Sequence, residues 1–137
     1  MSKLLIDSNI LVYSIDEDFQ FFNRARKVID STDKYLLTTS KNLAEFLSVI
    51  TKPNGYDLDP HLALEILGEI IQGIEIIYPN HESTQVFIEL VQQYQPKGLK
   101  IHDFEVISIG LANGCHEIAT FNTKDFNSVK EISLLNI

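Results

Sequence analysis

The feature that most restricts the fold of this chain is the alternation of short apolar runs with longer segments of helical periodicity. Runs of strand length lie at residues 3–6, 35–38, 74–78 and 117–121, and a weaker one lies at 132–134. No hairpin turn signal joins any two of them. The pattern therefore predicts an α/β fold with a mainly parallel sheet of about five strands.

The segments between these runs predict the helices. They are expected at residues 10–15, 19–29, 40–52, 60–73, 83–94 and 102–113. Ser40 is a suitable N-cap, Pro60 suits a first helical position, and Gly114 suits the end of the last helix. No linker interrupts the pattern, so a single domain over residues 1–137 is expected.

Composition narrows the function classes only slightly. The formal charge of -8 argues against a surface devoted to nonspecific nucleic-acid binding, but not against a nuclease whose acids surround metal ions. The lone Cys115 suits a reducing cytoplasm. Asp7 interrupts the only early apolar run, so neither a signal peptide nor a membrane span is expected.

Acidic and amide side chains recur where predicted strands end. Asp7 follows the first strand, and Asn122 and Asp125 follow the fourth. Glu45 lies one turn into the helix after the second strand, and Asp103 lies in the first turn of the helix before the fourth. In open parallel sheets, functional groups gather at the carboxyl ends of the strands.

Each of these residues also has a purely structural interpretation. Asp7 is a good helix cap, Glu45 suits a solvated position, and Asn122 and Asp125 suit a turn. Asp103 is harder to explain, because its helix is apolar on nearly all sides and an unpaired buried charge is very costly.

The joint pattern favours metal binding over four separate structural roles. Carboxylates that converge on one point repel each other unless a cation lies between them. Hard oxygen ligands suit Mg²⁺ or Mn²⁺, and these ions support hydrolysis of phosphodiesters. The residues thus point to metal-dependent phosphodiester hydrolysis.

The segments "LLIDSNILVYSID", "NLAEFLSVI" and "KIHDFEVISIGLANGCHEIATFNTKDF" together resemble a PIN domain of the small prokaryotic VapC toxin type. The resemblance covers essentially the whole chain. It implies a three-layer α/β/α fold and a divalent-metal-dependent ribonuclease, often a homodimer. It also implies a small antitoxin, encoded beside the toxin, that holds it inactive.

The same resemblance assigns site residues. Asp7, Glu45 and Asp103 match the family's first three acids, and Ser8 and Asn9 match the small polar residues that support the first. The family often has an acid where this chain has Asn122, with another acidic or polar residue where it has Asp125. This departure leaves the number of bound metal ions open, and leaves open which of these two residues completes the site.

Other functions fit less well or remain as alternatives. The sequence around Cys115 matches no protease signature, the four histidines lack zinc spacing, and no acid ends the third strand as in a receiver domain. The charge of -8 and Asn122 leave open a catalytically weak PIN-like module that binds protein or RNA. No substrate-binding residue is assigned, although two basic groups are candidates: Arg24, Arg26 and Lys27, and Lys97, Lys100 and Lys124.

Overall fold

The computed structural model describes residues 1–137 and contains one five-stranded sheet with the order β3-β2-β1-β4-β5. Its strands are β1 (Lys3–Ile6), β2 (Tyr35–Thr39), β3 (Glu75–Ile77), β4 (Glu117–Ala119) and β5 (Ser133–Leu134). Every neighbouring pair is parallel. The predicted fold class is therefore confirmed, because parallel strands require the helical crossovers that the sequence pattern indicated.

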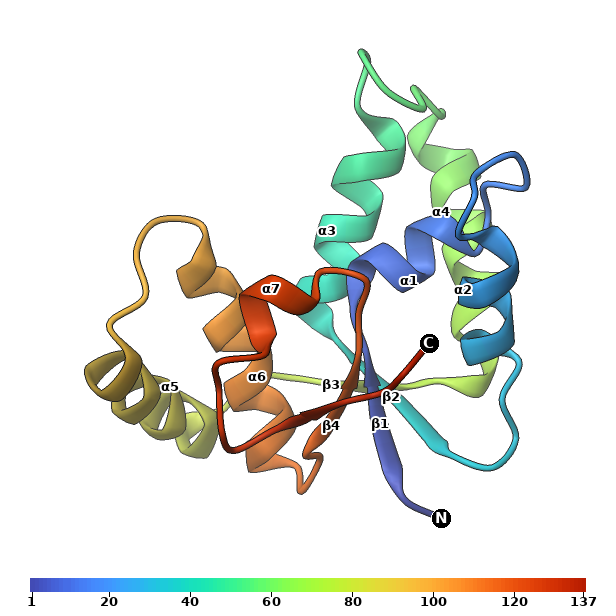
Figure 1. The fold of residues 1–137 in the computed structure, drawn as a ribbon. Helices are drawn as coiled ribbons and strands as arrows, with labels where there is room; N and C mark the ends of the chain where they lie inside the picture. The colour runs from blue at the N-terminus through green and yellow to red at the C-terminus, as the bar shows by residue number, and fades with distance from the viewer.

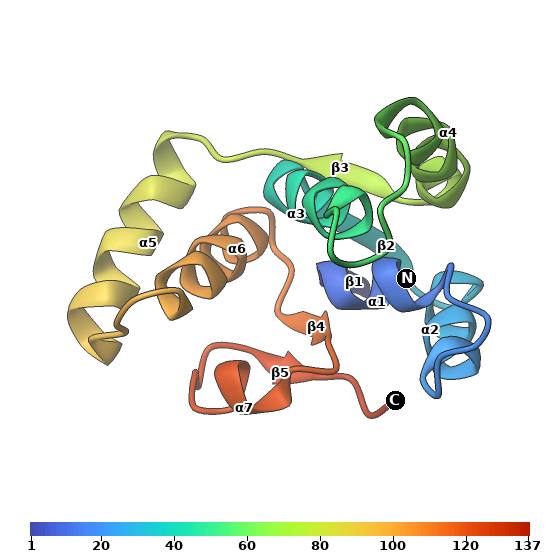
Figure 2. The ribbon, with the colours of Figure 1, turned by 90° about the horizontal axis from the view of Figure 1, so that it is seen from above.

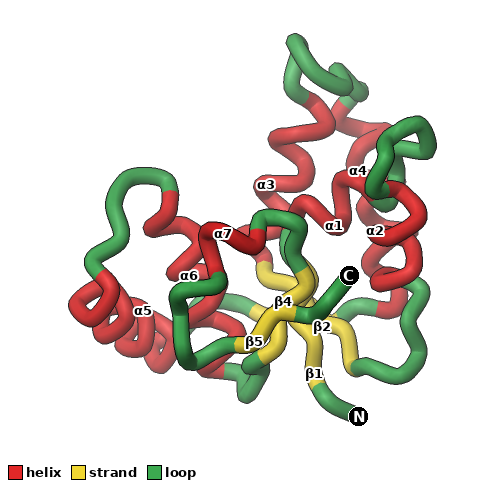
Figure 3. The backbone as a smooth tube through the Cα atoms, in the orientation of Figure 1, coloured by secondary structure: helices red, strands yellow, loops and turns green.

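Helices cover both faces of this sheet (Figures 1 and 2). One face carries α1 (Ser8–Tyr13), α2 (Phe22–Ile29), α3 (Ser40–Thr51) and α4 (Pro60–Ile70), followed by the short 3₁₀ turn η1 (Ile71–Gly73). The other carries α5 (His81–Tyr94), α6 (Lys100–Ala112) and α7 (Thr123–Phe126). The strands in the middle are short and lie between these two helical layers (Figure 3).

The central strand explains the two layers. Leu4 and Ile6 of β1 belong to the core under α1–α4, whereas Leu5 belongs to the core under α5–α7. All three side chains are fully buried. A strand buried on both faces reads as a continuous apolar run, and this is why the run before Asp7 has no polar residue.

Several element boundaries differ from the sequence-based expectations: α5 and α6 begin two residues earlier, at His81 and Lys100, whereas α4 and β4 end earlier, at Ile70 and Ala119. Helix α1 begins at Ser8, because Asp7 itself is the N-cap and accepts a hydrogen bond from the Ser8 amide at 2.8 Å. The cap of α3 is Thr39 rather than Ser40, and its hydroxyl accepts from the Asn42 amide at 3.1 Å. Helix α2 begins only at Phe22. The short helix α7 occupies the region that was expected to be a turn.

Helix α6 approaches the centre of the sheet closely at Gly110. A Cβ atom there would lie 3.3 Å from Leu5 Cδ2, tighter than most real contacts, so glycine permits this packing. Asp103 is seven residues earlier on the same helix face, two turns nearer the carboxyl edge of the sheet. The close packing of α6 therefore aims Asp103 at the ends of the central strands.

The strand order places a topological switch point between β1 and β4. Chain connections run from β1 through β2 to β3 on one side, whereas β4 and β5 lie on the other. At the carboxyl edge next to this switch point, α1, α3 and α7 begin, and α6 also begins there because it runs back along the sheet (Figure 1). Such a crevice is the usual ligand site of open α/β sheets. None of the helices combines the length and apolar character that a membrane span requires.

Candidate active site

Asp7 lies at the centre of this crevice and is held on both carboxylate oxygens. Its Oδ1 accepts hydrogen bonds from the Ser8 amide at 2.8 Å and from Asn42 Nδ2 at 3.1 Å. Its Oδ2 accepts from Thr120 Oγ1 at 2.8 Å and, at 3.4 Å, from Asn9 Nδ2. Only 7% of Asp7 is exposed. These donors come from the ends of three elements, so the fold itself fixes the carboxylate.

Thr120 and Asn9 join the ends of β1 and β4 in one network. Thr120 Oγ1 accepts from Asn9 Nδ2 and from the Asn122 amide, both at 3.0 Å. Asn9 Oδ1 accepts from the Phe121 amide at 3.1 Å, and the Asp7 amide donates to the Ala119 carbonyl at 3.0 Å. The network leaves no buried side-chain nitrogen or oxygen without a partner. Its bonds make the support of Asp7 rigid.

Burial nevertheless dominates the electrostatics of Asp7. The pKa of its carboxyl is raised above the usual 3.8, chiefly by burial and also by the charge of Glu45. The hydrogen bonds from Thr120, the Ser8 amide and Asn42 lower it in part. The hydrogen-bond donors therefore do not fully offset the free-energy cost of burying the negative charge. A bound cation would offset more of it.

Asp103 shows most directly that the acids influence one another. It is half-buried in the first turn of α6, and its pKa is raised from 3.8 to about 7. Burial is the largest cause, followed by the charges of Asp7, Asp125 and Glu45, whereas Lys100 lowers the value. No hydrogen bond contributes to the pKa of this carboxyl. Four acids from four segments thus share one electrostatic environment.

The remaining candidates lie at the rim. Glu45 is exposed on α3, one turn after the Thr39 cap. Asn122 is the N-cap residue of α7, and its Nδ2 donates a short hydrogen bond to Asp125 Oδ2. This bond joins the two residues whose roles the sequence left open, because each restrains the side chain of the other.

Two adjoining cavities meet at the acids. We call the first, of about 780 Å³, the lysine cavity; it is lined by Lys41, Glu45, Lys97, Leu99, Lys100, His102, Asp103, Val106, Asn122 and Asp125. We call the second, of about 400 Å³, the aromatic cavity; it is lined by Asp7, Ser8, Asn9, Val12, Tyr13, Phe19, Glu45, Val49, Tyr56, Asp103 and Asn122. Glu45, Asp103 and Asn122 line both. The shared residues therefore form the ridge between a hollow lined by three lysines and three acids and an aromatic one.

The donor set fits a hard divalent cation, since it consists of carboxylate and amide oxygens. The mutual rise of the carboxyl pKa values is what excess negative charge produces at such a site. No three histidine, cysteine or acidic side chains are grouped closely enough to hold an ion together. The acids converge on shared cavities and not as a preformed cage of ligands.

The structure brings together all the residues that the sequence indicated: Asp7, Ser8, Asn9, Glu45, Asp103, Asn122 and Asp125. Sequence reasoning missed Asn42 and Thr120, which are fully buried and hydrogen-bond to Asp7. Asn42 carried a detectable signal, because Thr39 and Asn42 have the spacing of a capping box. Thr120 carried only a weaker one, as a polar residue directly after a buried strand.

A comparison with models of protein families shows which family the chain belongs to. The PIN domain model matches residues 4–132, so the chain belongs to the PIN domain family. A search of curated proteins finds no match.

Solved structures give more particular likenesses. VapBC2 from Rickettsia felis, bound to a DNA fragment from its promoter, matches with a TM-score of 0.74 and 20% identity over 98% of each chain. DNA-bound VapBC from Salmonella typhimurium matches with a TM-score of 0.71 and 20% identity, also over 98% of each chain. VapC20 from Mycobacterium tuberculosis, a toxin that cleaves the sarcin–ricin loop, matches with a TM-score of 0.70 and 11% identity over 92% of this chain and 95% of that chain. At these identities the likeness establishes the shared fold, which is that of VapC toxins.

Proposed function

We propose that this chain is a divalent-metal-dependent endoribonuclease of the VapC toxin type. The observation that supports the proposal most strongly is the shared lining of the two cavities: Glu45, Asp103 and Asn122 line both, Asp7 lines one and Asp125 lines the other. Burial, and after it the charges of Asp7, Asp125 and Glu45, raises the pKa of Asp103, as expected for acids that share one site. Membership of the PIN domain family agrees with this chemistry.

The roles follow from the surroundings of each residue. Asp7 and Asp103 would hold the ion, and Glu45 would either bind it or orient the attacking water. Asn122 and Asp125 would complete the site, while Ser8 and Asn9 orient Asp7. A bound Mg²⁺ or Mn²⁺ would activate water at neutral pH and offset the charge that develops on the phosphate. Hydrolysis would leave a 5′-phosphate and a 3′-hydroxyl.

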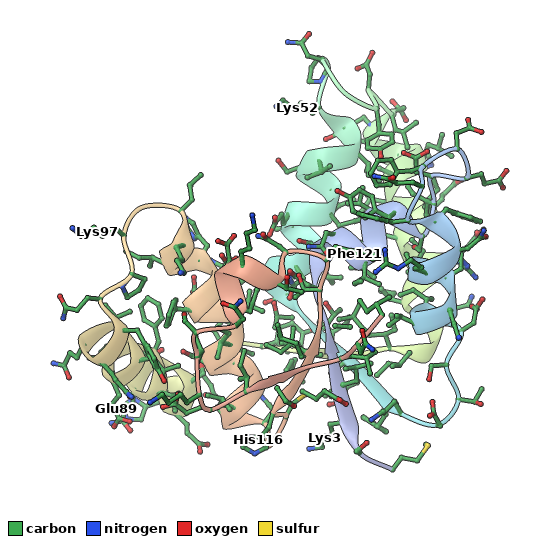
Figure 4. The ribbon with its side chains drawn as sticks, in the orientation of Figure 1. Lys3, Lys52, Glu89, Lys97, His116 and Phe121 are labelled. Atoms are coloured by element: carbon green, nitrogen blue, oxygen red, sulfur yellow. The ribbon has the colours of Figure 1, made fainter.

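The lysine cavity suits the RNA backbone. Lys41, Lys97 and Lys100 line it beside Asp103, so phosphates that approach the acids meet cations first. Lys41 is already paired with Glu105 at 2.7 Å, and Lys97 lies outermost, on the loop before α6 (Figure 4). Lys100 is close enough to Asp103 to lower the pKa of its carboxyl. Lys100 is therefore the lysine best suited to a phosphate beside the acids.

The partners belong to the same proposal. The similar chains from Rickettsia felis and Salmonella typhimurium were crystallised as VapBC bound to DNA, and another from Klebsiella pneumoniae was crystallised as a toxin–antitoxin complex. By analogy, this chain would form a homodimer in the cytoplasm, bind a small antitoxin protein and be inactive while bound.

A second candidate is a PIN-like module that binds RNA or protein without efficient cleavage. Two observations favour it. Asn122 is neutral, and no three acidic side chains form a ready group for an ion. The two functions differ in metal dependence, because a nuclease site must bind the ion in order to act.

The test is cleavage of a mixed RNA substrate by the purified chain with Mg²⁺, with Mn²⁺ and with EDTA. Cleavage is expected with either ion and should disappear with EDTA, Asp7→Asn or Asp103→Asn. Glu89→Gln is a matched control, because Glu89 is an exposed acid on α5, away from the crevice (Figure 4). Cleavage that survives EDTA and both site substitutions would refute the proposal.

Thermal unfolding separates the two candidates without an activity readout. A ligand that binds the folded state alone raises Tm as its concentration rises. Mg²⁺ or Mn²⁺ should therefore raise the Tm of the wild type and of Glu89→Gln, and raise that of Asp103→Asn much less. If neither ion changes the Tm of the wild type, the result would favour the binding module.

A further inference from the structure

The aromatic cavity has a feature that hydrolysis of a phosphate does not require. Tyr13, Phe19 and Tyr56 line it together with Asp7, Glu45 and Asp103. Unlike Phe46, Phe104 and Phe126, which are fully buried in the two cores, these three rings are only half-buried or, in Tyr56, 38% exposed. They form part of a cavity wall and are not simply core.

The rings of this wall are supported from behind. Tyr13 and Phe19 lie with centroids 4.4 Å apart, and Phe19 meets Phe21 edge to face at 5.4 Å. Phe21 in turn stacks on Phe121 at 4.6 Å and nearly parallel, with Arg24 within 5.3 Å of both ring centres. Phe121 lies in the middle of the molecule, next to α1 (Figure 4). This second row holds the first, so Tyr13 and Phe19 have fixed positions.

Tyr56 encloses the cavity from another segment. It belongs to the connection between α3 and α4, and its hydroxyl donates a 2.6 Å hydrogen bond to Asp16 Oδ2 in the connection after α1. The bond links two loops that are far apart in the sequence. The bond therefore restrains Tyr56, the one residue of the cavity lining that comes from the connection between α3 and α4.

The chemistry of the lining selects the ligand. Aromatic faces favour flat, uncharged π-systems, and the carboxylates beside them favour an uncharged group over a second phosphate. A nucleobase meets both conditions, and base–aromatic stacking is the usual way in which proteins hold unpaired strands. A base in a duplex is already stacked on its neighbours and cannot enter.

Resting on the proposed nuclease function, we propose that the aromatic cavity binds an unpaired base next to the scissile phosphate. The backbone of the strand then continues over the acidic ridge into the lysine cavity. Phe19 provides the stacking face, and the Tyr56–Asp16 bond positions the Tyr56 ring.

The test compares two probes that share a ribose-phosphate backbone: an oligoadenylate of about ten nucleotides, and an abasic strand of equal length. Binding is measured by fluorescence anisotropy with Mg²⁺ in the Asp103→Asn protein, chosen because the proposed function predicts that it does not cleave. Stacking tolerates any base, so oligoadenylate is a sufficient probe. It should bind at least about fivefold more tightly than the abasic strand.

Three further substitutions in the Asp103→Asn protein test which residues produce the preference for the base. Phe19→Leu keeps an apolar side chain but loses the π face, so it should abolish the preference for the base. Tyr56→Phe keeps the ring and should retain most of it. Tyr35→Ala removes a 42% exposed tyrosine at the amino end of β2, the opposite edge of the sheet, and should change nothing. Unchanged unfolding temperatures show that each variant is folded.

Several results would overturn the inference. They are equal binding of the two probes, no binding of oligoadenylate, or a preference that survives Phe19→Leu. Cleavage by the wild type is measured separately. A chain that cleaves RNA but shows no base preference keeps the nuclease function and loses the base site. A chain that prefers the base-containing strand but does not cleave RNA keeps the base site and loses the nuclease function.

Discussion

Asp7 and Asp103 are both aspartates of the same crevice, but the protein holds them in opposite ways. Asp7 is buried and accepts hydrogen bonds from Ser8, Asn42 and Thr120. Asp103 is half-buried, and no hydrogen bond contributes to its pKa, which burial and neighbouring acids raise to about 7. The fold therefore fixes one carboxylate before any ligand arrives, whereas the state of the other depends on charge. We call Asp7 with its hydrogen-bond donors the rigid side of the site, and Asp103 the adjustable side.

The largest expected effect tests whether both sides are needed. Asp7→Asn and Asp103→Asn should each lower kcat/KM for RNA cleavage by roughly 100-fold or more, because metal catalysis supplies several kcal/mol of barrier lowering. Steady-state kinetics with Mg²⁺ measures this, with Glu89→Gln as the control. If Asp103→Asn alone kept near-normal activity, the adjustable side would be dispensable.

A smaller effect should reveal the rigid side. Thr120→Val removes the hydroxyl that donates to Asp7 and accepts from Asn9 and the Asn122 amide. Loss of such a supporting group costs about 10- to 100-fold in metal affinity or activity. Thr120→Ser keeps the hydroxyl and should stay within a few-fold of the wild type. Equal losses in the two variants would show that packing, and not the hydrogen bond, positions Asp7.

The adjustable side should appear in the pH dependence of stability. The pKa of Asp103 is about 7 when folded and 3.8 ordinarily, so the folded state binds more protons between these values. The free energy of unfolding therefore falls as pH rises from about 4 to 7. In Asp103→Asn the free energy of unfolding should fall less as pH rises. At pH 8 it should exceed that of the wild type by on the order of 1 kcal/mol, a modest difference because the half-buried carboxylate keeps part of its hydration.

Urea unfolding without metal at pH 5 and pH 8 measures this difference, and Glu89→Gln should follow the wild type at both. Added Mg²⁺ should stabilise the wild type more at pH 8 than at pH 5, because protons compete for the same carboxylate. A wild type and an Asp103→Asn variant with parallel pH profiles would contradict the assigned charge coupling.

The smallest expected effect distinguishes the two cavities. Lys100→Ala should raise KM for RNA by a few-fold. It should also make the slope of log K against log salt concentration shallower by about 0.7, the value for one neutralised phosphate on a single strand. The control is Lys130→Ala, because Lys130 is an exposed lysine between α7 and β5 that lines neither cavity. If the wild type and Lys100→Ala have the same salt slope, the RNA backbone does not contact Lys100.

The sequence was a good guide to the fold because the pattern of buried residues repeats along the whole chain. Strands near β1 read as apolar runs, and Gly114, with a positive φ of 73°, marks the end of α6 as expected. The errors lie at element ends, where hydrogen bonds decide the boundary. Thr39 displaced Ser40 as cap because its hydroxyl and the Asn42 side chain bond to each other's backbone amides.

The site was only partly predictable. Acids near strand ends can be found by position, so Asp7 and Asp103 were identified from the sequence. The support of Asp7 by Asn42 and Thr120 spans 35 and 113 positions along the chain. Hydrogen bonds of that range depend on the packing of the sheet. The same holds for the Tyr56–Asp16 bond, which joins two loops with no sequence pattern in common.

The pairing of β1 with β4 has a consequence for how the protein is made. Asp7 is translated well before its Thr120 donor, which lies 113 positions further along the chain, and before Asp103. A nascent chain that has emerged only as far as α5 has the first strand and its acid without the partners that complete the crevice. The crevice can therefore assemble only after β4 has been synthesised, because the support of Asp7 and its neighbouring acid both come from that later part of the chain.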